Sequence, residues 1–215
     1  MAPETKIYLI RHGAVENPND IVYGRMQGFP LSSQGKEQVK KLAEVLRSKG
    51  VKFEAIYSSP LERAVQTAQI IKREFGLANI KINEALIDTA VPGIEGKPMD
   101  VVRAVQFDNF RPEIKVAGSE IPQDVIDRMS RFLKFVKQNH QEETVAVVTH
   151  GDPSRFALWW LQHPEGGLPK KLRDDDYLGK AEAVVLNFGE GDQFLGYEHI
   201  RQENSNPLAE ERSIN

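Results

Sequence analysis

The sequence predicts an α/β fold: a three-layer α/β/α sandwich with a mainly parallel sheet and an antiparallel hairpin at one edge. Short apolar runs rich in β-branched residues alternate along the chain with longer segments whose apolar residues recur every three or four positions. Such alternation is typical of a parallel sheet with helices packed on its faces. Near the C-terminal end, two further runs follow one another across a Glu-Gly-Asp turn, which indicates a β-hairpin.

Six apolar runs are predicted to be strands: residues 7–10, 53–57, 80–82, 144–149, 183–188 and 193–200. Four segments with helical spacing are predicted to be helices: residues 33–49, the segment after Ser59, residues 122–139 and residues 153–160. Ser59 is expected to be the N-cap of the second helix, with Pro60 at its first position, and Pro153 is expected to open the last helix. The residues from 202 onward are expected to be frayed.

Length and composition indicate one domain over residues 1–215, with insertions at about 83–118 and 164–180. The chain is 40% hydrophobic and 27% charged, so it is able to bury a core. Its net charge is −3 without a basic block, and we expect neither nucleic acid nor membrane as a partner. The absence of cysteine excludes disulfides, thiolate metal sites and cysteine nucleophiles. No apolar run is long enough to span a bilayer, and residues 1–5 are too short and polar for a signal peptide, so we expect a cytoplasmic protein.

Two arginines and two histidines fall where such a sheet would bring them together. Arg11 and His12 end the first strand, His150 ends the strand at 144–149, and Arg63 lies in the first turn of the second helix. Ligands of open α/β sheets bind at the carboxyl ends of the strands, and helix N-termini favour anions. Taken singly, either histidine could be an ordinary strand-end residue. Together the four side chains predict a pocket for a phosphate dianion.

The same residues lie in three motifs that resemble those of the histidine phosphatase superfamily, which includes the cofactor-dependent phosphoglycerate mutases. The motifs are, in chain order, Arg11-His12-Gly13, Ser58-Ser59-Pro60-Leu61-Glu62-Arg63-Ala64 followed by Gln66-Thr67-Ala68, and Val148-Thr149-His150-Gly151. The resemblance covers about residues 6–200, and three motifs in the right order are more specific than any one of them. It implies a phosphoglycerate mutase-like fold.

The resemblance implies a role for each residue of the phosphate pocket. His12 would be the nucleophile that forms a phosphohistidine, and Arg11, Arg63 and His150 would hold the phosphoryl oxygens during an in-line transfer. His12 must be neutral to attack, so its other ring nitrogen is expected to donate to a backbone carbonyl. Neither a metal nor a cofactor is expected, because the cationic side chains take the role that Mg²⁺ plays elsewhere.

The general acid is implied by a carboxylate motif. The family places a carboxylate in a Leu-x-Glu segment, with a Glu-Gly pair seven residues further on. Here Asp88 stands in the first place and Glu95 in the second. Asp88 is therefore expected to donate a proton to the leaving oxygen and later to act as the base for the attacking water. The chain departs from the family in having Asp for Glu, and Glu84 and Glu95 are alternatives for the same role.

Six further residues are expected to contact the substrate, most of them in the loop at residues 14–31: Gly13, Asn17, Tyr23, Gly24, Arg25 and Gly151. The Gly-Arg-Met-Gln-Gly run of this loop resembles the family's, but the Asp that usually precedes Pro30 is missing and the loop is shorter. Its Asn-Pro…Tyr-Gly-Arg form resembles a less characterised phosphatase branch.

These inferences predict a metal-independent phosphomonoesterase that acts on a small phosphorylated metabolite through phospho-His12, as a monomer or a homodimer. One alternative is a phosphoglycerate mutase-type phosphomutase. The shorter loop and the absence of the mutase's Trp-Asn element after Arg-His-Gly argue against it. The other alternative is a non-catalytic, phosphate-binding regulatory module, against which the intact set of arginines and histidines argues. Specificity is expected in residues 89–118 and 164–180.

Overall fold

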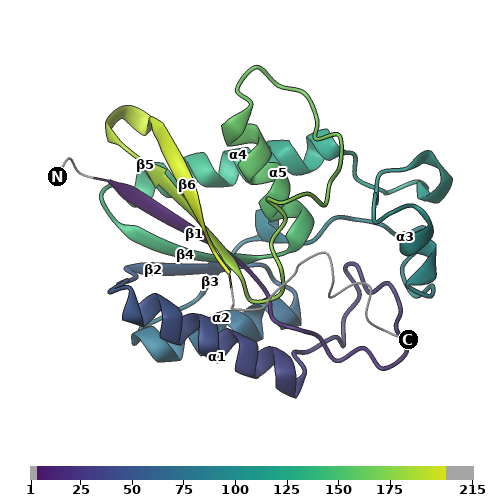
Figure 1. The fold of residues 1–215 in the computed structure, drawn as a ribbon, viewed down its shortest axis with the longest axis horizontal. Coiled ribbons are helices and arrows are strands. Elements are labelled where there is room, and N and C mark those ends of the chain that lie inside the picture. The colour runs from purple at the N-terminus through teal and green to yellow at the C-terminus, as the bar shows by residue number, and fades with distance from the viewer. Residues whose placement is uncertain (1–3, 202–215) are drawn as a thin grey trace.

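The computed structural model describes residues 4–201 and contains a six-stranded sheet between two layers of helices (Figure 1). The strands are, in chain order, β1 (Thr5–Arg11), β2 (Ala55–Ser58), β3 (Lys81–Ile82), β4 (Thr144–Thr149), β5 (Ala183–Phe188) and β6 (Phe194–Ile200). All six predicted strands are present, with ends within two residues of those predicted. The segment from residue 202 onward, predicted to be frayed, lies outside the described residues.

The sheet has the strand order β3-β2-β4-β1-β5-β6. β3, β2, β4 and β1 run parallel, while β5 is antiparallel to β1 and pairs with β6 as a hairpin at the edge. The predicted mainly parallel sheet with an antiparallel edge hairpin is therefore confirmed. β1 and β4 are direct neighbours, with Arg11 opposite Thr149. The residues that follow them, His12 and His150, consequently leave the sheet at the same edge.

Helices cover both faces of the sheet. α1 (Ser33–Ser48) and α2 (Glu62–Phe75) lie on one face, and α4 (Pro122–Asn139) and α5 (Gly151–Gln162) lie on the other (Figure 1). Successive side chains of a strand point to opposite faces, so β1 supplies both cores. Its residues Tyr8 and Ile10 pack in the α1–α2 layer, and its residues Ile7 and Leu9 pack in the α4–α5 layer. Burying a side chain of this size contributes roughly 1.5–3 kcal/mol.

Two helices begin at residues other than those predicted. α2 has Leu61 as its N-cap, so the assignment of Ser59 to that position is wrong. The Ser59 hydroxyl is used differently, because it lies 2.8 Å from Nε2 of His150 and accepts from the amide of Leu61. α5 begins at Gly151 instead of Pro153. Proline is tolerated inside a first turn, since the amide that it lacks would have no partner there.

The first insertion packs against the loop that follows β1. It contains a short helix, α3 (Asp100–Ala104), and 3₁₀ turns at η1 (Glu84–Leu86) and η2 (Pro112–Ile114). The amide of Val22 in the loop donates to the carbonyl of Lys97 in the insertion over 2.8 Å. A small apolar cluster completes the contact: Val22, Val91, Ile94 and Val102. Loop and insertion together form one rim of the edge at which His12 and His150 emerge.

The second insertion, residues 164–180, contains neither helix nor strand. Its last part nevertheless packs inward, since Tyr177 and Leu178 are buried. None of the helices within residues 4–201 is long and apolar enough to cross a membrane.

Candidate active site

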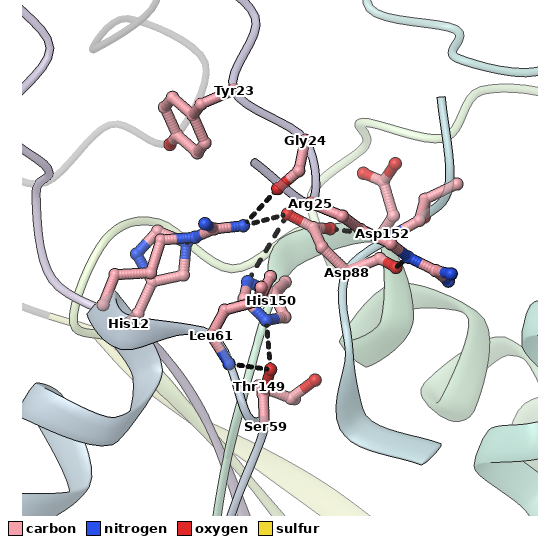
Figure 2. A network of polar contacts seen from close by, with 12 residues as sticks. His12, Tyr23, Gly24, Arg25, Ser59, Leu61, Asp88, Thr149, His150 and Asp152 are labelled. Carbon is pink, nitrogen blue, oxygen red and sulfur yellow. Dashed lines mark hydrogen bonds and ion pairs between the residues drawn. The ribbon is translucent and has the colours of Figure 1, made fainter. Parts of the chain in front are cut away.

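Two histidines and an arginine from three elements meet at the carboxyl edge of the sheet (Figure 2). His12 directly follows β1, His150 directly follows β4, and Arg63 is the second residue of α2. The two imidazole rings lie 5.1 Å apart between centroids, and Nε of Arg63 lies 3.3 Å from Nε2 of His12. All three residues are only 1% exposed. The structure thus gathers these side chains around one point.

The hydrogen bonds of His12 determine its tautomer. Nδ1 lies 2.8 Å from the carbonyl oxygen of Gly13, so Nδ1 carries the ring proton and donates it. This backbone partner was predicted. Nε2 then has a lone pair, to which the Nε–H of Arg63 donates. Burial lowers the pKa of His12 well below its usual value, and the charges of Lys180 and Arg63 lower it further. His12 is therefore neutral at pH 7, which is the state that a nucleophile needs.

The neutral state of buried His12 predicts that acid destabilises the fold. In the unfolded chain, a histidine gains a proton as the pH falls through about 6.5, whereas folded His12 gains one only at lower pH. The unfolded state therefore binds more protons in this window, and the free energy of unfolding falls as the pH falls below about 6.5. We expect a His12→Gln variant to lose less stability between pH 7 and pH 5 than the wild type, in urea unfolding. An unchanged pH dependence would contradict a neutral His12.

Asp88 is the carboxylate that reaches this group. Its Oδ2 lies 2.9 Å from Nη2 of Arg63 and 3.4 Å from Nδ1 of His150, and Figure 2 shows both contacts converging on it. Burial acts to raise the pKa of Asp88, but His150, Arg63 and the amide of Thr89 outweigh it and lower the pKa to about 2. Asp88 is thus a carboxylate in this structure, held by the same side chains that would bind a phosphoryl group.

The two other candidate acids lie elsewhere. Glu84 is exposed at the start of η1. Oε1 of Glu95 accepts from the backbone amide of Arg25 over 2.7 Å and so holds the loop after β1. Neither residue lines the cavity beside His12. Asp88 is the one of the three that the structure places against the arginine and histidines.

Arg11 and His150 are fixed by backbone and hydroxyl partners. Nη1 of Arg11 donates to the carbonyl of Leu178 over 2.6 Å, and its guanidinium lies over the ring of Tyr177. Nε2 of His150 lies 2.8 Å from Oγ of Ser59 (Figure 2). Burial lowers the pKa of His150 well below its usual value, although the Asp88 carboxylate opposes this. Each side chain therefore has its orientation set before any ligand binds.

A cavity of about 90 Å³ opens beside His12. Its inner wall includes Arg11, His12, Gly24 and Asp88, while both insertions contribute to the rest of the wall. Among the side chains that line it within residues 4–201, Nε of Arg11 and Oγ1 of Thr89 are buried without a hydrogen-bond partner. Buried polar groups are rarely left unpaired, because each costs on the order of 1–3 kcal/mol. Their placement around one cavity indicates a ligand rich in acceptor oxygens.

The six predicted substrate contacts divide into two groups. Tyr23, Gly24 and Gly151 line the cavity. Asn17 does not, because its side chain bonds both the amide and the carbonyl of Ile21 and closes a turn in the loop. Arg25 is also directed elsewhere: its Nε donates to the backbone carbonyl of Asp88, and its Nη2 pairs with Glu120. Asn17 and Arg25 therefore shape the loop.

Gly13, the remaining predicted contact, is required by close packing. A Cβ at this position would lie 2.5 Å from the carbonyl oxygen of Gly35 in α1. Its amide donates to Oγ1 of Thr67 in α2 over 3.3 Å. Only glycine lets the chain pass between these two helices and still offer its carbonyl to His12.

Several side chains at the site were not predicted. Tyr177 donates to Oδ1 of Asp152 over 2.8 Å, and Asn109 donates to Oδ2 of the same carboxylate over 2.8 Å. Burial raises the pKa of Asp152. Lys180 donates to the hydroxyl of Tyr23 over 3.0 Å. Asp152 adjoins the third motif, which is a usable signal, but Tyr177 and Lys180 lie in a segment without any periodic pattern.

Within residues 4–201, no cluster of three or more histidine and acidic side chains is placed to hold a metal ion. The polar side chains around the cavity include the guanidinium groups of Arg11 and Arg173, which suit an oxyanion.

An uncharged imidazole beside buried arginines at a sheet edge is the kind of site that phosphoryl-transfer enzymes use. The chain belongs to the histidine phosphatase superfamily, branch 1, whose family model matches residues 7–195.

The relatives of the chain include both phosphatases and mutases. Phosphoserine phosphatase 1 of Hydrogenobacter thermophilus is 33% identical over 160 residues, or 70% of this chain and 72% of that protein. An uncharacterised protein of Mycobacterium tuberculosis is 39% identical over 90 residues, and the match spans 42% of this chain and 43% of that relative. The solved structure of Bacillus stearothermophilus YhfR has a TM-score of 0.75 at 26% identity, covering 88% of this chain and 94% of that one. 2,3-Bisphosphoglycerate-dependent phosphoglycerate mutases are also among the relatives.

Proposed function

We propose that this protein is a metal-independent phosphomonoesterase that works through a phosphohistidine on His12. The observation that carries the proposal is the state of that side chain. Its Nδ1–H donates to the carbonyl of Gly13, its Nε2 lone pair faces Arg63, and its buried ring is neutral. An unprotonated nitrogen held next to a guanidinium is suited to attack phosphorus while the arginine neutralises the phosphoryl oxygens.

The residues present account for both chemical steps. First, Nε2 of His12 forms a bond to phosphorus as the bond to the leaving oxygen breaks, and Asp88 gives that oxygen a proton. Arg11, Arg63 and His150 hold the phosphoryl oxygens. Second, water attacks phosphorus and gives a proton to Asp88 as the nitrogen–phosphorus bond breaks. Inorganic phosphate then leaves, and His12 is restored.

Asp88 must be protonated for the first step, although its pKa is about 2 in this structure. A phosphoryl dianion between Arg63 and His150 would compete with Asp88 for both partners and repel its carboxylate. Both effects raise the pKa of Asp88 in the complex. The required proton enters either on the substrate, as a monoanion, or on Asp88 when the dianion binds.

The substrate is proposed to be a small phosphorylated metabolite. The cavity is small, and its outer wall is partly apolar, with Val91, Val102 and Phe107 from the first insertion. Arg173 of the second insertion lies on the same wall, with its guanidinium 3.9 Å from the ring of Phe107. The leaving group would therefore contact residues from both insertions, as expected for the segments that set specificity.

Three assays separate this proposal from the alternatives. A phosphatase hydrolyses an aryl phosphate with EDTA present and releases one phosphate per phenol. A phosphomutase instead interconverts phosphoglycerates and needs a bisphosphate primer, and mutases among the relatives make this the rival to test first. A regulatory module binds inorganic phosphate or vanadate without turnover. Hydrolysis in EDTA without a primer supports the proposal, whereas primer-dependent isomerisation or binding alone would refute it.

A further inference from the structure

Lys180, which lies outside all three motifs, is held beside Arg11 and His12 by hydrogen bonds of the backbone around it. The amide of Ala181 donates to the carbonyl of His12 over 3.2 Å, and the amide of Arg11 donates to the carbonyl of Glu182 over 3.0 Å. Nη1 of Arg11 also donates to the carbonyl of Leu178. These bonds lie on both sides of Lys180 in the chain, so its Cα has little freedom relative to His12.

The side chain of Lys180 is directed to the site by Tyr23. Its Nζ donates to the Tyr23 hydroxyl over 3.0 Å. The ring of the same tyrosine lies 4.8 Å from the guanidinium carbon of Arg63, which donates to Nε2 of His12. Tyr23 lines the cavity and stands over the network in Figure 2. The phenol therefore holds two cations, one at its oxygen and one at its face, next to the nucleophile.

Keeping this lysine charged is costly without an anion. Burial and the charges of Arg11 and Arg63 lower its pKa, while the hydroxyl of Tyr23 acts in the opposite direction, and the resulting pKa is about 8. Among the charges near His12, that of Lys180 lowers the pKa of His12 most. A third cation packed close to two arginines is unfavourable for folding alone. A bound dianion would compensate the positive charges of all three side chains.

We propose that Lys180, held by Tyr23, is a further positioning residue of the phosphate site and increases its affinity for the phosphoryl dianion. The inference rests on the proposed function for its catalytic meaning, since a phosphoryl group must bind next to His12. It does not require that the protein turn substrate over, because the ammonium would act on any bound phosphate.

The charge on Lys180 makes phosphate binding depend on pH in a particular window. The charged and titratable groups that face it are Arg11, Arg63, Tyr23 and His12. Both arginines stay charged, and His12 stays neutral, between pH 6.5 and pH 9. Lys180 loses its charge as the pH rises through about 8. Tyr23 also titrates below its usual range, so a Tyr23→Phe variant is needed to separate the two groups.

Calorimetric binding of inorganic phosphate to the full chain tests the proposal. Lys180→Met is expected to weaken phosphate binding roughly tenfold or more at pH 6.5, and the difference from wild type should narrow by pH 9. Lys180→Arg is expected to bind phosphate as wild type does at pH 6.5 and more tightly than wild type at pH 9, because its guanidinium stays charged. Tyr23→Phe, which retains the ring over Arg63, is expected to keep the pH dependence in weakened form. Lys171→Met, at an exposed position of the same segment, is the matched control and should bind as wild type does.

Failure of this inference is distinct from failure of the proposed function. Unchanged phosphate affinity in Lys180→Met at pH 6.5 would overturn the role of Lys180, even if the wild type hydrolyses aryl phosphates. Weakened binding that Lys180→Arg restores supports the role even if no variant shows turnover. Thermal unfolding of each variant shows whether it is folded. If Lys180→Met does not fold, phosphate binding by the folded Lys180→Arg that is no tighter than wild type at pH 9 also contradicts the inference.

Discussion

Replacing His12 by alanine is expected to abolish phosphatase turnover, by a factor of at least about 10⁴. Within residues 4–201, no second imidazole is placed to substitute for it. Nε2 of His150 is engaged with Ser59, and its Nδ1 faces Asp88. The arginines remain in the variant, so inorganic phosphate is expected to bind still. Rapid-quench experiments with a radiolabelled substrate should trap an acid-labile phosphoprotein in the wild type and none in His12→Ala.

The matched control for this variant is His163→Ala. His163 stacks on Trp159 at the end of α5, with 3.6 Å between ring centroids, and does not line the cavity. The His163→Ala variant should keep the wild-type rate and the wild-type phosphoprotein level. A labelled intermediate in His12→Ala, or turnover near the wild-type rate, would place the nucleophile elsewhere and remove the basis for the proposed mechanism.

Replacing Asp88 by asparagine is expected to slow the release of poor leaving groups far more than that of good ones. An aliphatic alkoxide needs a proton as it departs, so loss of the general acid should cost about 10²–10⁴ in kcat for an aliphatic phosphate ester. A nitrophenolate departs without this help, so the same variant should hydrolyse nitrophenyl phosphate with a much smaller loss. The measurement is kcat for both esters in wild type and variant.

Two comparisons sharpen the test of Asp88. Glu84→Gln changes an exposed carboxylate of the same segment and should affect neither ester. The wild type should also show kcat/KM for the aliphatic ester falling as the pH rises above about 6, where phosphate monoesters lose their second proton. Equal losses for both esters in Asp88→Asn would assign the carboxylate to holding Arg63, to which it is paired at 2.9 Å, and leave the acid role to another group.

The sequence predicts best those helices and strands whose position depends on a local pattern of buried apolar residues. The helix at Pro122–Asn139 and the strand at Thr144–Thr149 have the predicted bounds. The apolar stripe of the helix faces one core, and the apolar run of the strand is buried in both cores. Ser59 shows where local preference fails. Its hydroxyl suits an N-cap, but the bond to His150, 91 residues away, takes it instead. Capping preferences are weak enough for such a tertiary partner to override them.

The residues of the site fall into the same two groups, namely those that local pattern predicts and those that long-range contacts place. Arg63, His12 and His150 lie directly after strands or in a first helical turn, so the sheet topology brings them together in a way that motif order predicts. Tyr177 lines the same cavity, and Lys180 reaches Tyr23 on its wall, both from a segment without helix or strand. They are placed by bonds to the backbone and side chains near β1, and no periodicity in the sequence records such long-range contacts.

The cavity is lined both by residues at the ends of the strands and by residues of the two insertions. The arginines and histidines proposed to hold and attack the phosphoryl group lie on or directly after β1, β4 and α2. The wall facing the departing alcohol is built largely from residues 83–118 and 164–180, which also supply Asp88. Within them, Asp88 and residues 177–180 contact the reaction centre, whereas residues 89–118 and 164–176 supply few side chains to the two cores of the sheet and are free to diverge. Grafting residues 89–118 and 164–176 from a relative with another substrate leaves Asp88 and Lys180 in place. The graft should therefore transfer the choice of alcohol and preserve the rate on an activated aryl ester.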